Sequence, residues 1–208
     1  MPRSPRITIP DVPYHITQRG NHKQDVFFSP DDRVSYLEWL QHYSSLYKLG
    51  IIAYCLMTNH VHIVGIPRNE ESISSIMQFV NMRYTQLINR NMGFDGHLWH
   101  GRYFSTALDE TYLWHAIRYV EQNPVRAGMV EFAEQYQWSS ASYHCGIGMN
   151  NLLYSDEALK SFFEDWIQTL RSVPDQKITD TIRIRTQKGF PCGDSDFDRR
   201  VLDKRGKD

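Results

Sequence analysis

Cysteine is scarce in this chain, with three residues among 208, far apart and without a CxxC pair. An odd number of distant cysteines builds neither a disulfide framework nor a cysteine zinc site, and it is typical of a reducing compartment. Long hydrophobic runs are missing too, since a membrane span needs about 18 or more apolar residues in a row. We therefore expect a cytoplasmic protein with no transmembrane helix and no membrane contact.

An excess of either charge is also missing. Lys and Arg number 23 against 24 Asp and Glu, so the net charge is −1. This balance excludes a polycation that binds nucleic acid through bulk charge, but it allows a local basic groove. Hydrophobic residues make up 41% of the chain, which is enough for one packed core.

Strands and helices alternate along the first half of the sequence. Periodicity and end signals predict short strands at 14–19 and 103–108, and a hairpin of two strands at 51–57 and 60–66. They predict helices from Pro30 to about Leu49, ended by Gly50, and over 72–91 and 109–123. We predict an α+β fold in which an antiparallel sheet has helices packed on one face.

The second part of the chain is more polar. Residues 1–150 are expected to form the main domain, and residues 151–208 a helical and charged extension. Within the extension, residues 152–170 read as a helix, whereas 172–208 are rich in Asp, Arg and Lys. That composition predicts a peripheral or partly disordered tail.

The sharpest local motif is His60-Val61-His62 in the second hairpin strand. Residues two apart in a strand point to the same face, so both imidazoles emerge together, with Val61 and Ile63 on the opposite face. Two histidines at this spacing are half of a site for a divalent metal. The alternative is a pair of solvent-facing histidines without a ligand.

The helix over 109–123 carries polar residues opposite its apolar stripe. Tyr119 and Asn123 are four apart, so they lie one turn apart on the same face. A phenol and a carboxamide placed in this way can supply a nucleophile and a neutral metal ligand. The competing interpretation is that Tyr119 is a half-buried packing residue and that Asn123 ends the helix before Pro124.

Arg, Asn and aromatic residues are interleaved at 81–103, and residues 19–24 form a second small loop that is polar and positive. Arg reaches phosphates and aromatic rings stack on unpaired bases, so this composition suits single-stranded nucleic acid. Candidate DNA-binding residues are Arg19, Asn21, Lys23, Arg83, Arg90, Trp99 and Arg102. The aromatic residues among them are alternatively anchors that hold a loop on the core.

Four segments together resemble one family. They are the histidine motif after Met57-Thr58-Asn59, YVEQNPVRAG at 119–128, GHLWHGRY at 96–103 and QRGN at 18–21. This combination resembles REP-associated tyrosine transposases, which are relatives of the single-tyrosine HUH transposases of bacterial insertion sequences. The resemblance covers roughly residues 6–145, and the stretch 183–193 is similar to a tail found in part of the family.

The resemblance implies a ferredoxin-like sheet that carries the histidines on a central strand. It also implies that the protein nicks and rejoins single-stranded DNA beside a REP-type palindromic hairpin, through a 5′-phosphotyrosine intermediate. His60, His62 and Asn123 match the ligands of Mg²⁺ or Mn²⁺, and Tyr119 matches the nucleophile. Gln122 remains an alternative ligand, and Tyr84 is a rival nucleophile that lies in an apolar stripe.

Neutral ligands suit this chemistry because they leave the ion its full charge to polarise the scissile phosphate. The implied setting is the bacterial cytoplasm, at the nucleoid, with the protein as a monomer or homodimer. Two other functions remain open. One is a catalytically silent protein that binds DNA hairpins, and the other is a metal-dependent nuclease in which water attacks and Tyr119 only packs.

Overall fold

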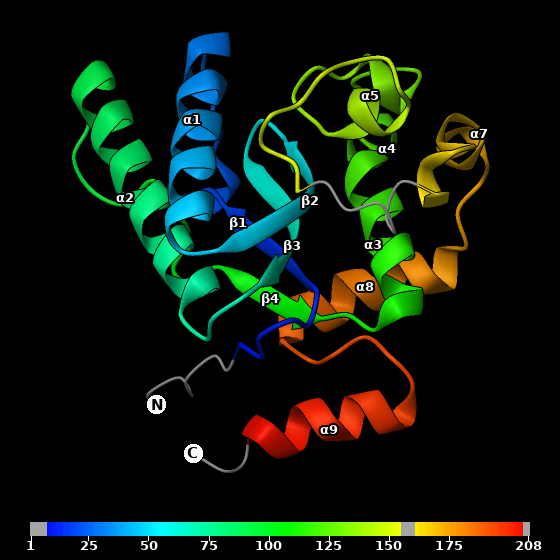
Figure 1. Ribbon diagram of the computed structural model, residues 1–208. Helices are drawn as coiled ribbons and strands as arrows, with labels where there is room; N and C mark the ends of the chain where they lie inside the picture. Colours follow the sequence, from blue (N-terminus) through cyan, green and yellow to red (C-terminus); the bar gives the residue numbers. More distant parts are fainter. Residues whose placement is uncertain (1–7, 155–160, 206–208) are drawn as a thin grey trace.

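The computed structural model describes residues 8–154 and 161–205, and its centre is a four-stranded antiparallel sheet (Figure 1). The strands are β1 (Tyr14–Arg19), β2 (Leu49–Leu56), β3 (His60–Pro67) and β4 (Phe104–Ala107), in the order β2-β3-β1-β4. Helix α1 (Pro30–Leu46) follows β1, and α2 (Ser72–Met92) follows β3. This β-α-β-β-α-β order with β1 and β3 in the centre is the ferredoxin-like arrangement, which confirms the predicted fold class.

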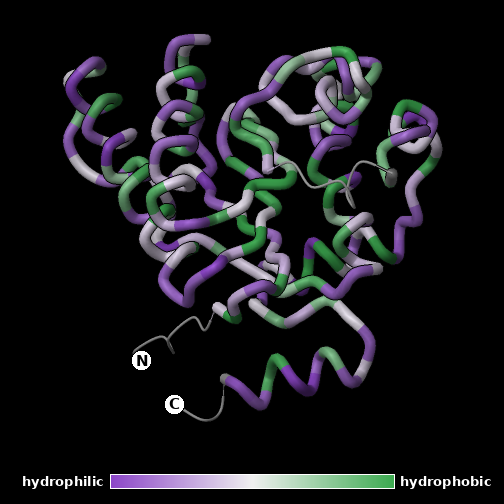
Figure 2. The backbone as a smooth tube through the Cα atoms, in the orientation of Figure 1, coloured by the Kyte–Doolittle hydropathy of each residue, from purple (hydrophilic) through white to green (hydrophobic). Residues whose placement is uncertain are grey.

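Helices cover both faces of the sheet, whereas the sequence predicted helices on one face. The ferredoxin-like helices α1 and α2 do share one face, where Ile16 and Ile63 enter the larger core. The opposite face, which carries Val64 of β3, is covered by α3 (Glu110–Glu121) and α8 (Gln176–Lys188). Figure 2 shows apolar segments concentrated along the strands between these two layers. The second layer was not predicted because α8, which packs with α3 on this face, lies in a segment expected to be a peripheral or partly disordered tail.

The first helix begins where the sequence predicts and ends earlier. The Ser29 hydroxyl accepts a hydrogen bond from the backbone N–H of Asp32, and the Asp32 carboxylate accepts one from that of Ser29, which makes a capping box. The chain leaves α1 after Leu46 and turns at Lys48, whose φ is 56°. Gly50 therefore does not end the helix as predicted but lies inside β2.

The extension beyond residue 150 contains helices that pack on the rest of the molecule. Of the helix expected over 152–170, the structure describes a short 3₁₀ turn (Ser161–Phe163) and α7 (Trp166–Arg171), and residues 155–160 lie outside the described part. Helices α8 and α9 (Ser195–Arg205) occupy most of the predicted tail. Helix α8 buries Thr179, Ile182 and Thr186 against β4 and α3, so the described part of this extension is helical and packs on the sheet domain.

The short elements α4 (Asn123–Arg126), α5 (Ala141–His144), η1 (Asn21–Lys23) and η2 (Ala133–Gln135) complete the structure. In the part of the chain that the structure describes, no helix combines the length and the apolar character that a membrane crossing requires.

Candidate active site

The candidate site lies on the face of the sheet that α3 and α8 cover. The central strands β1 and β3 pair so that Arg19 is opposite His60 and Thr17 is opposite His62. His15, one pleat further along β1, points to the same side. A cavity of about 610 Å³ lies over this face, and α3, α4, α8 and the turn after β1 complete its walls. We call it the histidine cavity.

His60 and His62 share this cavity, as the strand spacing predicts. Their ring centroids are 4.9 Å apart. Val61 and Ile63 lie in the core on the opposite face. The Nδ1 atom of His60 is 2.6 Å from Oδ1 of Asn59, and the Nδ1 atom of His62 is 2.8 Å from Nε2 of His15. Among the described residues, the Nε2 atom of each histidine is therefore the nitrogen without a hydrogen bond.

His15 is a site residue that the sequence did not reveal. It stacks on His62 with ring centroids 5.1 Å apart, and its Nδ1 atom lies 2.9 Å from Oγ1 of Thr186 on α8. The resulting chain of hydrogen bonds runs from α8 through β1 to β3. The alternation of His15 with Ile16 in β1 was a usable signal, but the contact with Thr186 joins residues 171 positions apart.

Burial keeps all three imidazoles neutral. It lowers the pKa of His15 to about 3, helped by the charge of Arg126, and that of His60 to about 4, helped by Arg19. Burial also lowers the pKa of His62 well below its usual value, and the neighbouring histidines add to this effect. Neutral imidazoles have free nitrogen lone pairs at pH 7, which is the state that a metal ligand needs.

Tyr119 lies over the histidines on α3. Its ring meets those of His15 and His62 edge to face, with centroids 5.7 Å away in both cases. Helix α3 begins at the capping side chain of Asp109, which accepts from the backbone N–H of Tyr112. Burial raises the pKa of the Tyr119 hydroxyl, so the phenol is protonated at neutral pH.

Arg126 is the nearest positive charge to the phenol. Its guanidinium lies 4.3 Å from the centroid of the Tyr119 ring and donates a hydrogen bond of 2.7 Å to the backbone carbonyl of Tyr119. The positive charge of Arg126 opposes the effect of burial and lowers the pKa of Tyr119. This arginine belongs to the YVEQNPVRAG segment, but no pattern in the sequence predicted a role for it.

A buried network on the other side of α3 holds the helix in place. The Glu121 carboxylate is fully buried and accepts hydrogen bonds from the Ser140 hydroxyl, from His144 Nδ1 at 2.6 Å and from Trp166 Nε1 at 2.6 Å. Three donors from α5, α7 and the residue before α5 thus converge on one carboxylate. A residue two positions from Tyr119 is in this way fixed to the rest of the protein.

Asn123 and Gln122, the two alternative ligands, point to different places. Asn123 lines the histidine cavity, and its Nδ2 atom donates to the carbonyls of Tyr119 and Val120, both at 3.1 Å. Its amide oxygen has no hydrogen-bond partner among the described residues and is available as a ligand. Gln122 is buried and donates to the carbonyl of Leu170 at 2.7 Å, away from the histidines. The geometry favours Asn123 over Gln122.

Tyr84, the rival nucleophile, is excluded by its position. It is fully buried in the α1/α2 core on the opposite face of the sheet, and its hydroxyl donates to the backbone carbonyl of Val26 at 2.6 Å. Burial strongly raises the pKa of this hydroxyl. Tyr84 is a packing residue, as its place in an apolar stripe indicated.

The donors fit a divalent ion of the softer kind. Two neutral imidazole nitrogens and one amide oxygen can face the same cavity, and none of these groups carries a negative charge. The described residues contain no group of three or more His, Cys, Asp or Glu side chains suited to a metal. A metal held here therefore relies on two histidines and neutral oxygen donors, a set that suits Mn²⁺ better than Mg²⁺.

The candidate DNA-binding residues separate into three places. Arg19, Asn21 and Lys23 line the histidine cavity. Trp99 and Arg102 line a second cavity beside α2. Arg83 and Arg90 lie on α2 and line neither cavity, and the Arg83 side chain is 3.5 Å from the Tyr43 hydroxyl of α1.

The turn after β1 is built for close packing. A Cβ atom on Gly20 would lie 2.3 Å from the carbonyl oxygen of Gln24, so only glycine fits there. His22 and Lys23 both adopt left-handed backbone conformations, with φ of 50° and 63°. Such conformations cost energy outside glycine and cluster at binding sites. The QRGN segment thus presents Asn21 and Lys23 at the rim of the histidine cavity.

Comparison with known proteins assigns the class. A family model described as "Transposase IS200 like" matches residues 8–123, the segment that contains the whole sheet, both histidines and Tyr119. The fold and the matched segment are those of a transposase. The match covers more than half of the chain, so this protein belongs to the IS200-like transposase family.

Two further proteins resemble the chain. A protein of Haemophilus influenzae named "Putative REP-associated tyrosine transposase" is 22% identical over 119 residues, which are 52% of this chain and 65% of that protein. The chain thus spans just under two thirds of the length of this relative. A solved structure of a REP-associated tyrosine transposase bound to a REP hairpin superposes with a TM-score of 0.59 at 16% identity, over 76% of this chain and 93% of that one. These likenesses confirm the resemblance and the fold that the sequence predicted.

Proposed function

We propose that this transposase-family protein nicks and rejoins single-stranded DNA beside a hairpin, with Tyr119 as the nucleophile. The observation that carries the proposal is the position of the Tyr119 ring, 5.7 Å from the ring centroids of His62 and His15. This contact places the phenol ring beside His62, one of the two neutral histidines that would hold a metal ion near the scissile phosphate. Family membership supports DNA cleavage as the reaction class.

The histidine cavity supplies the ligands for the ion in this proposal. His60 and His62 would hold Mg²⁺ or Mn²⁺ through their Nε2 atoms, and Asn123 through its amide oxygen. When bound there, the ion would polarise the scissile phosphate and stabilise its developing charge. His15 orients His62, because a His62 Nδ1–H that donates to His15 Nε2 leaves the Nε2 lone pair of His62 free.

The proposed cleavage step needs no reactant other than the tyrosine and the DNA. The phenolic oxygen of Tyr119 attacks the phosphorus, a new P–O bond forms and the bond to the 3′ oxygen breaks. The phenolic proton leaves with the 3′ oxygen as a free 3′-hydroxyl. The phosphotyrosine ester keeps the energy of the broken bond, so a 3′-hydroxyl can reverse the step and join strands.

Positive side chains around the cavity stabilise the charged form of Tyr119 and attract the phosphates of the DNA. The Arg126 guanidinium lies 4.3 Å from the centroid of the Tyr119 ring, and its positive charge favours the ionised form of the phenol. Arg19 and Lys23 line the same cavity and carry charges that attract the DNA backbone. The cavity also contains Tyr119 and both histidines from one chain, which supports action by a monomer without exchange of α3 between subunits.

The hairpin substrate is inferred from similarity. A solved relative with this fold is a REP-associated tyrosine transposase bound to a REP hairpin. We propose that this chain acts on a palindromic hairpin of the same kind, with a single-stranded segment beside it that reaches the histidine cavity.

The test is a covalent adduct. A hairpin oligonucleotide with single-stranded flanks, labelled at its 3′ end, is incubated with the protein and Mn²⁺ and run on a denaturing gel. We expect a protein–DNA adduct from the wild type and from Tyr112→Phe, a control on the same helix outside the histidine cavity. Tyr119→Phe should form none.

Other outcomes identify the competing functions. An adduct that persists in Tyr119→Phe would disprove the assignment of the nucleophile. Cleavage without an adduct, unchanged by that substitution, would indicate a hydrolytic nuclease. Hairpin binding without cleavage at any metal concentration would indicate a catalytically silent DNA-binding protein.

A further inference from the structure

Helix α8 presents one side to the histidine cavity. Arg183, Thr186 and Gln187 follow one another at helical spacing, so they lie on the same side of the helix, and all three line the cavity. The catalytic arrangement proposed above involves only Thr186, whose hydroxyl lies 2.9 Å from Nδ1 of His15. Arg183 and Gln187 are exposed polar residues in the same cavity, and that arrangement gives them no role.

The surrounding fold fixes the direction of this side of α8. The Asp175 carboxylate accepts hydrogen bonds from two backbone N–H groups of the first turn, and Gly189 ends the helix with a φ of 72°. Ile182 is fully buried, and the helix packs on β4, α3 and β1. Arg183 therefore projects from a fixed backbone, and only its side chain has to move to meet a ligand.

The charge of Arg183 acts on the proposed nucleophile. Burial raises the pKa of the Tyr119 hydroxyl, and the positive charges of Arg126 and Arg183 oppose that rise. Arg126 is occupied, because its guanidinium lies over the Tyr119 ring and donates to the backbone carbonyl of the same residue. Arg183 comes from another helix that packs on α3 and is the more exposed of the two. It is therefore the arginine that can turn toward a bound phosphate.

The partner of Arg183 in the structure is one that a phosphate can replace. Its Nη2 atom lies 2.8 Å from the Asp180 carboxylate, one helical turn earlier, and the two side chains are 57% and 38% exposed. Exposed ion pairs contribute little to stability, because water and salt screen both charges. A phosphate offers a guanidinium two parallel charge-assisted hydrogen bonds. Exchange of Asp180 for a phosphate is therefore favourable.

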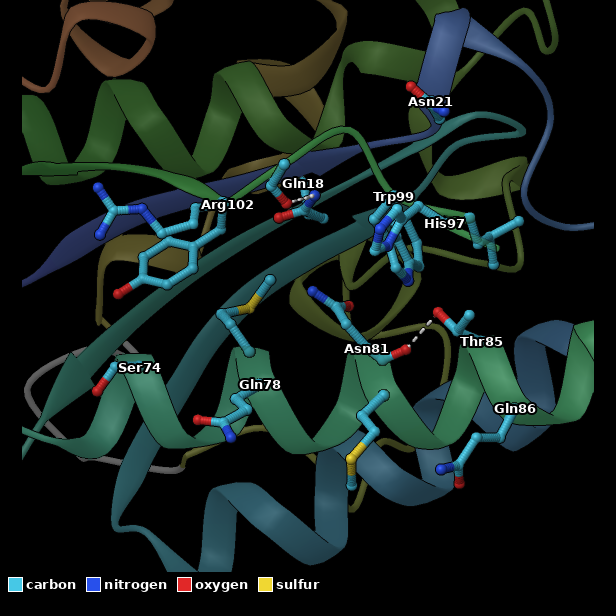
Figure 3. Close-up of a pocket in the computed structure, with 15 residues that line it drawn as sticks. Gln18, Asn21, Ser74, Gln78, Asn81, Thr85, Gln86, His97, Trp99 and Arg102 are labelled. Atoms are coloured by element: carbon cyan, nitrogen blue, oxygen red, sulfur yellow. Dashed lines mark hydrogen bonds between the residues drawn. The ribbon is translucent and has the colours of Figure 1, made fainter. Parts of the chain in front are cut away.

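Positive charge is concentrated at the histidine cavity. Arg19 and Lys23 supply it from β1 and the following turn, and Arg183 supplies it from α8. No Asp or Glu is present among the described residues that line this cavity. The cavity beside α2, shown in Figure 3, has Arg102 as its single Lys or Arg among the described residues, and this side chain extends away from Trp99. A phosphate is therefore attracted to the histidine cavity more strongly than to the cavity beside α2.

We propose that Arg183 binds the phosphate that Tyr119 attacks, which makes helix α8 part of the active site. The guanidinium donates hydrogen bonds to the non-bridging oxygens of this phosphate in place of Asp180, and it holds the phosphorus beside the phenolic oxygen. No proton leaves the guanidinium, and the bonds that form and break are those of the proposed function. The inference rests on that function, because it takes the same DNA strand as its ligand.

The experiment removes the charge of one phosphate at a time. Hairpin oligonucleotides with a single-stranded flank carry one methylphosphonate at each flank position in turn, and their dissociation constants are measured by fluorescence anisotropy in EDTA, without cleavage. The cleaved position is mapped separately, from the DNA that stays on the protein in the Mn²⁺ adduct. In the wild type, the methylphosphonate at the cleaved position should weaken binding about threefold to tenfold, as expected for a charge-assisted contact of a half-exposed side chain.

A double-mutant cycle assigns this contact to Arg183. Arg183→Gln should weaken binding of the unmodified oligonucleotide by a similar factor and leave binding of the hairpin alone unchanged. In this variant, the methylphosphonate at the cleaved position should weaken binding less than about twofold, whereas the penalties at other positions remain. Arg183→Lys should restore only part of the affinity, because lysine lacks the planar guanidinium. Lys177→Gln removes an exposed charge from the same helix outside the cavity and should keep every wild-type penalty.

Asp180 provides a change in the opposite direction. Asp180→Asn removes the group that competes with the phosphate for Arg183, so binding of the unmodified flanked oligonucleotide should strengthen about twofold to threefold. This gain should be absent when Asp180→Asn is combined with Arg183→Gln. A gain that persists in the double variant would indicate general repulsion between Asp180 and DNA, and it would contradict the exchange of partners.

Two further results would overturn the inference while the proposed function stands. One is a wild-type penalty at the cleaved position in Arg183→Gln, which would mean that this residue does not contact the attacked phosphate. The other is loss of the penalty at a different position, which would assign Arg183 to a phosphate that is not attacked. Absence of any adduct from the wild type would refute the proposed function, and this inference with it.

Discussion

The Nε2 atom of His15 lies 2.8 Å from the Nδ1 atom of His62, and the other nitrogen of His15 lies 2.9 Å from the Thr186 hydroxyl. Both histidines are buried and neutral. In the arrangement that leaves the His62 Nε2 lone pair free, the proton on His62 Nδ1 points to His15, and the proton on His15 Nδ1 points to Thr186. One hydroxyl on α8 thus helps to select the tautomer of an expected metal ligand.

Removing the His15 imidazole should weaken metal binding. In His15→Ala, the Mn²⁺ concentration for half-maximal adduct formation should rise about 10-fold to 100-fold, as is usual when the partner of a metal-binding histidine is lost. His15→Gln offers an amide to His62, so it should restore part of the lost metal affinity. The exposed His42→Ala serves as the control. An unchanged metal requirement in His15→Ala, with the melting temperature also unchanged, would contradict the assigned role.

Replacing Arg126 should slow the covalent step. Arg126→Gln removes the charge nearest to the Tyr119 ring, and adduct formation measured in single-turnover experiments should fall about 10-fold to 100-fold. Arg126→Lys should recover only part of the rate because lysine lacks the planar guanidinium. Arg199→Gln, an exposed arginine on α9, should leave the rate unchanged. A full rate in Arg126→Gln would mean that this residue only caps the helix.

Most of the core of the fold could be predicted from the sequence. Alternation predicted β1 with the bounds that the structure has, and the two apolar runs around Thr58-Asn59 predicted the β2–β3 hairpin. The capping box at Ser29 marked the start of α1. These signals are local, because each depends on residues within one element.

The predictions from sequence failed where contacts between residues far apart in the chain decide the structure. Gly50 looked like a helix end, but its strand pairing with Ile66 places it in β2. The polar composition of residues 172–208 predicted a peripheral or partly disordered tail, whereas the buried positions Thr179, Ile182 and Thr186 of α8 follow a helical spacing that the charged background obscured. For the same reason His15 escaped notice, since its partners are 47 and 171 residues away.

The network around Glu121 should make a large contribution to stability. Trp166→Phe removes a donor to a fully buried carboxylate, and the free energy of unfolding in urea should fall by about 1.5–3 kcal/mol. Trp39→Phe replaces a half-buried indole that has no such hydrogen bond among the described residues. It should lower the free energy of unfolding by less than about 1 kcal/mol. Equal losses in the two variants would mean that the hydrogen bond to Glu121 contributes little.

The partly exposed Cys145 should react slowly with alkylating agents. Burial and the charges of Glu121 and Glu134 raise its pKa to about 12, so the thiolate is rare at pH 8. Alkylation by iodoacetamide, followed by mass spectrometry, should be at least about a hundredfold slower than for a free thiol and should still be rising at pH 10. In Met149→Cys, at a residue that is 99% exposed, the rate should level off near pH 9. A plateau for Cys145 at that pH would contradict the raised pKa.

The hydrogen bond between residues 15 and 186 sets an order of events during synthesis. A ribosome has released both histidines and the tyrosine helix well before it translates α8. Until Thr186 emerges, the nascent chain carries the groups proposed for catalysis without the hydroxyl that aligns His15. The arrangement proposed for catalysis is therefore complete only after α8 has left the ribosome and packed against β4 and α3.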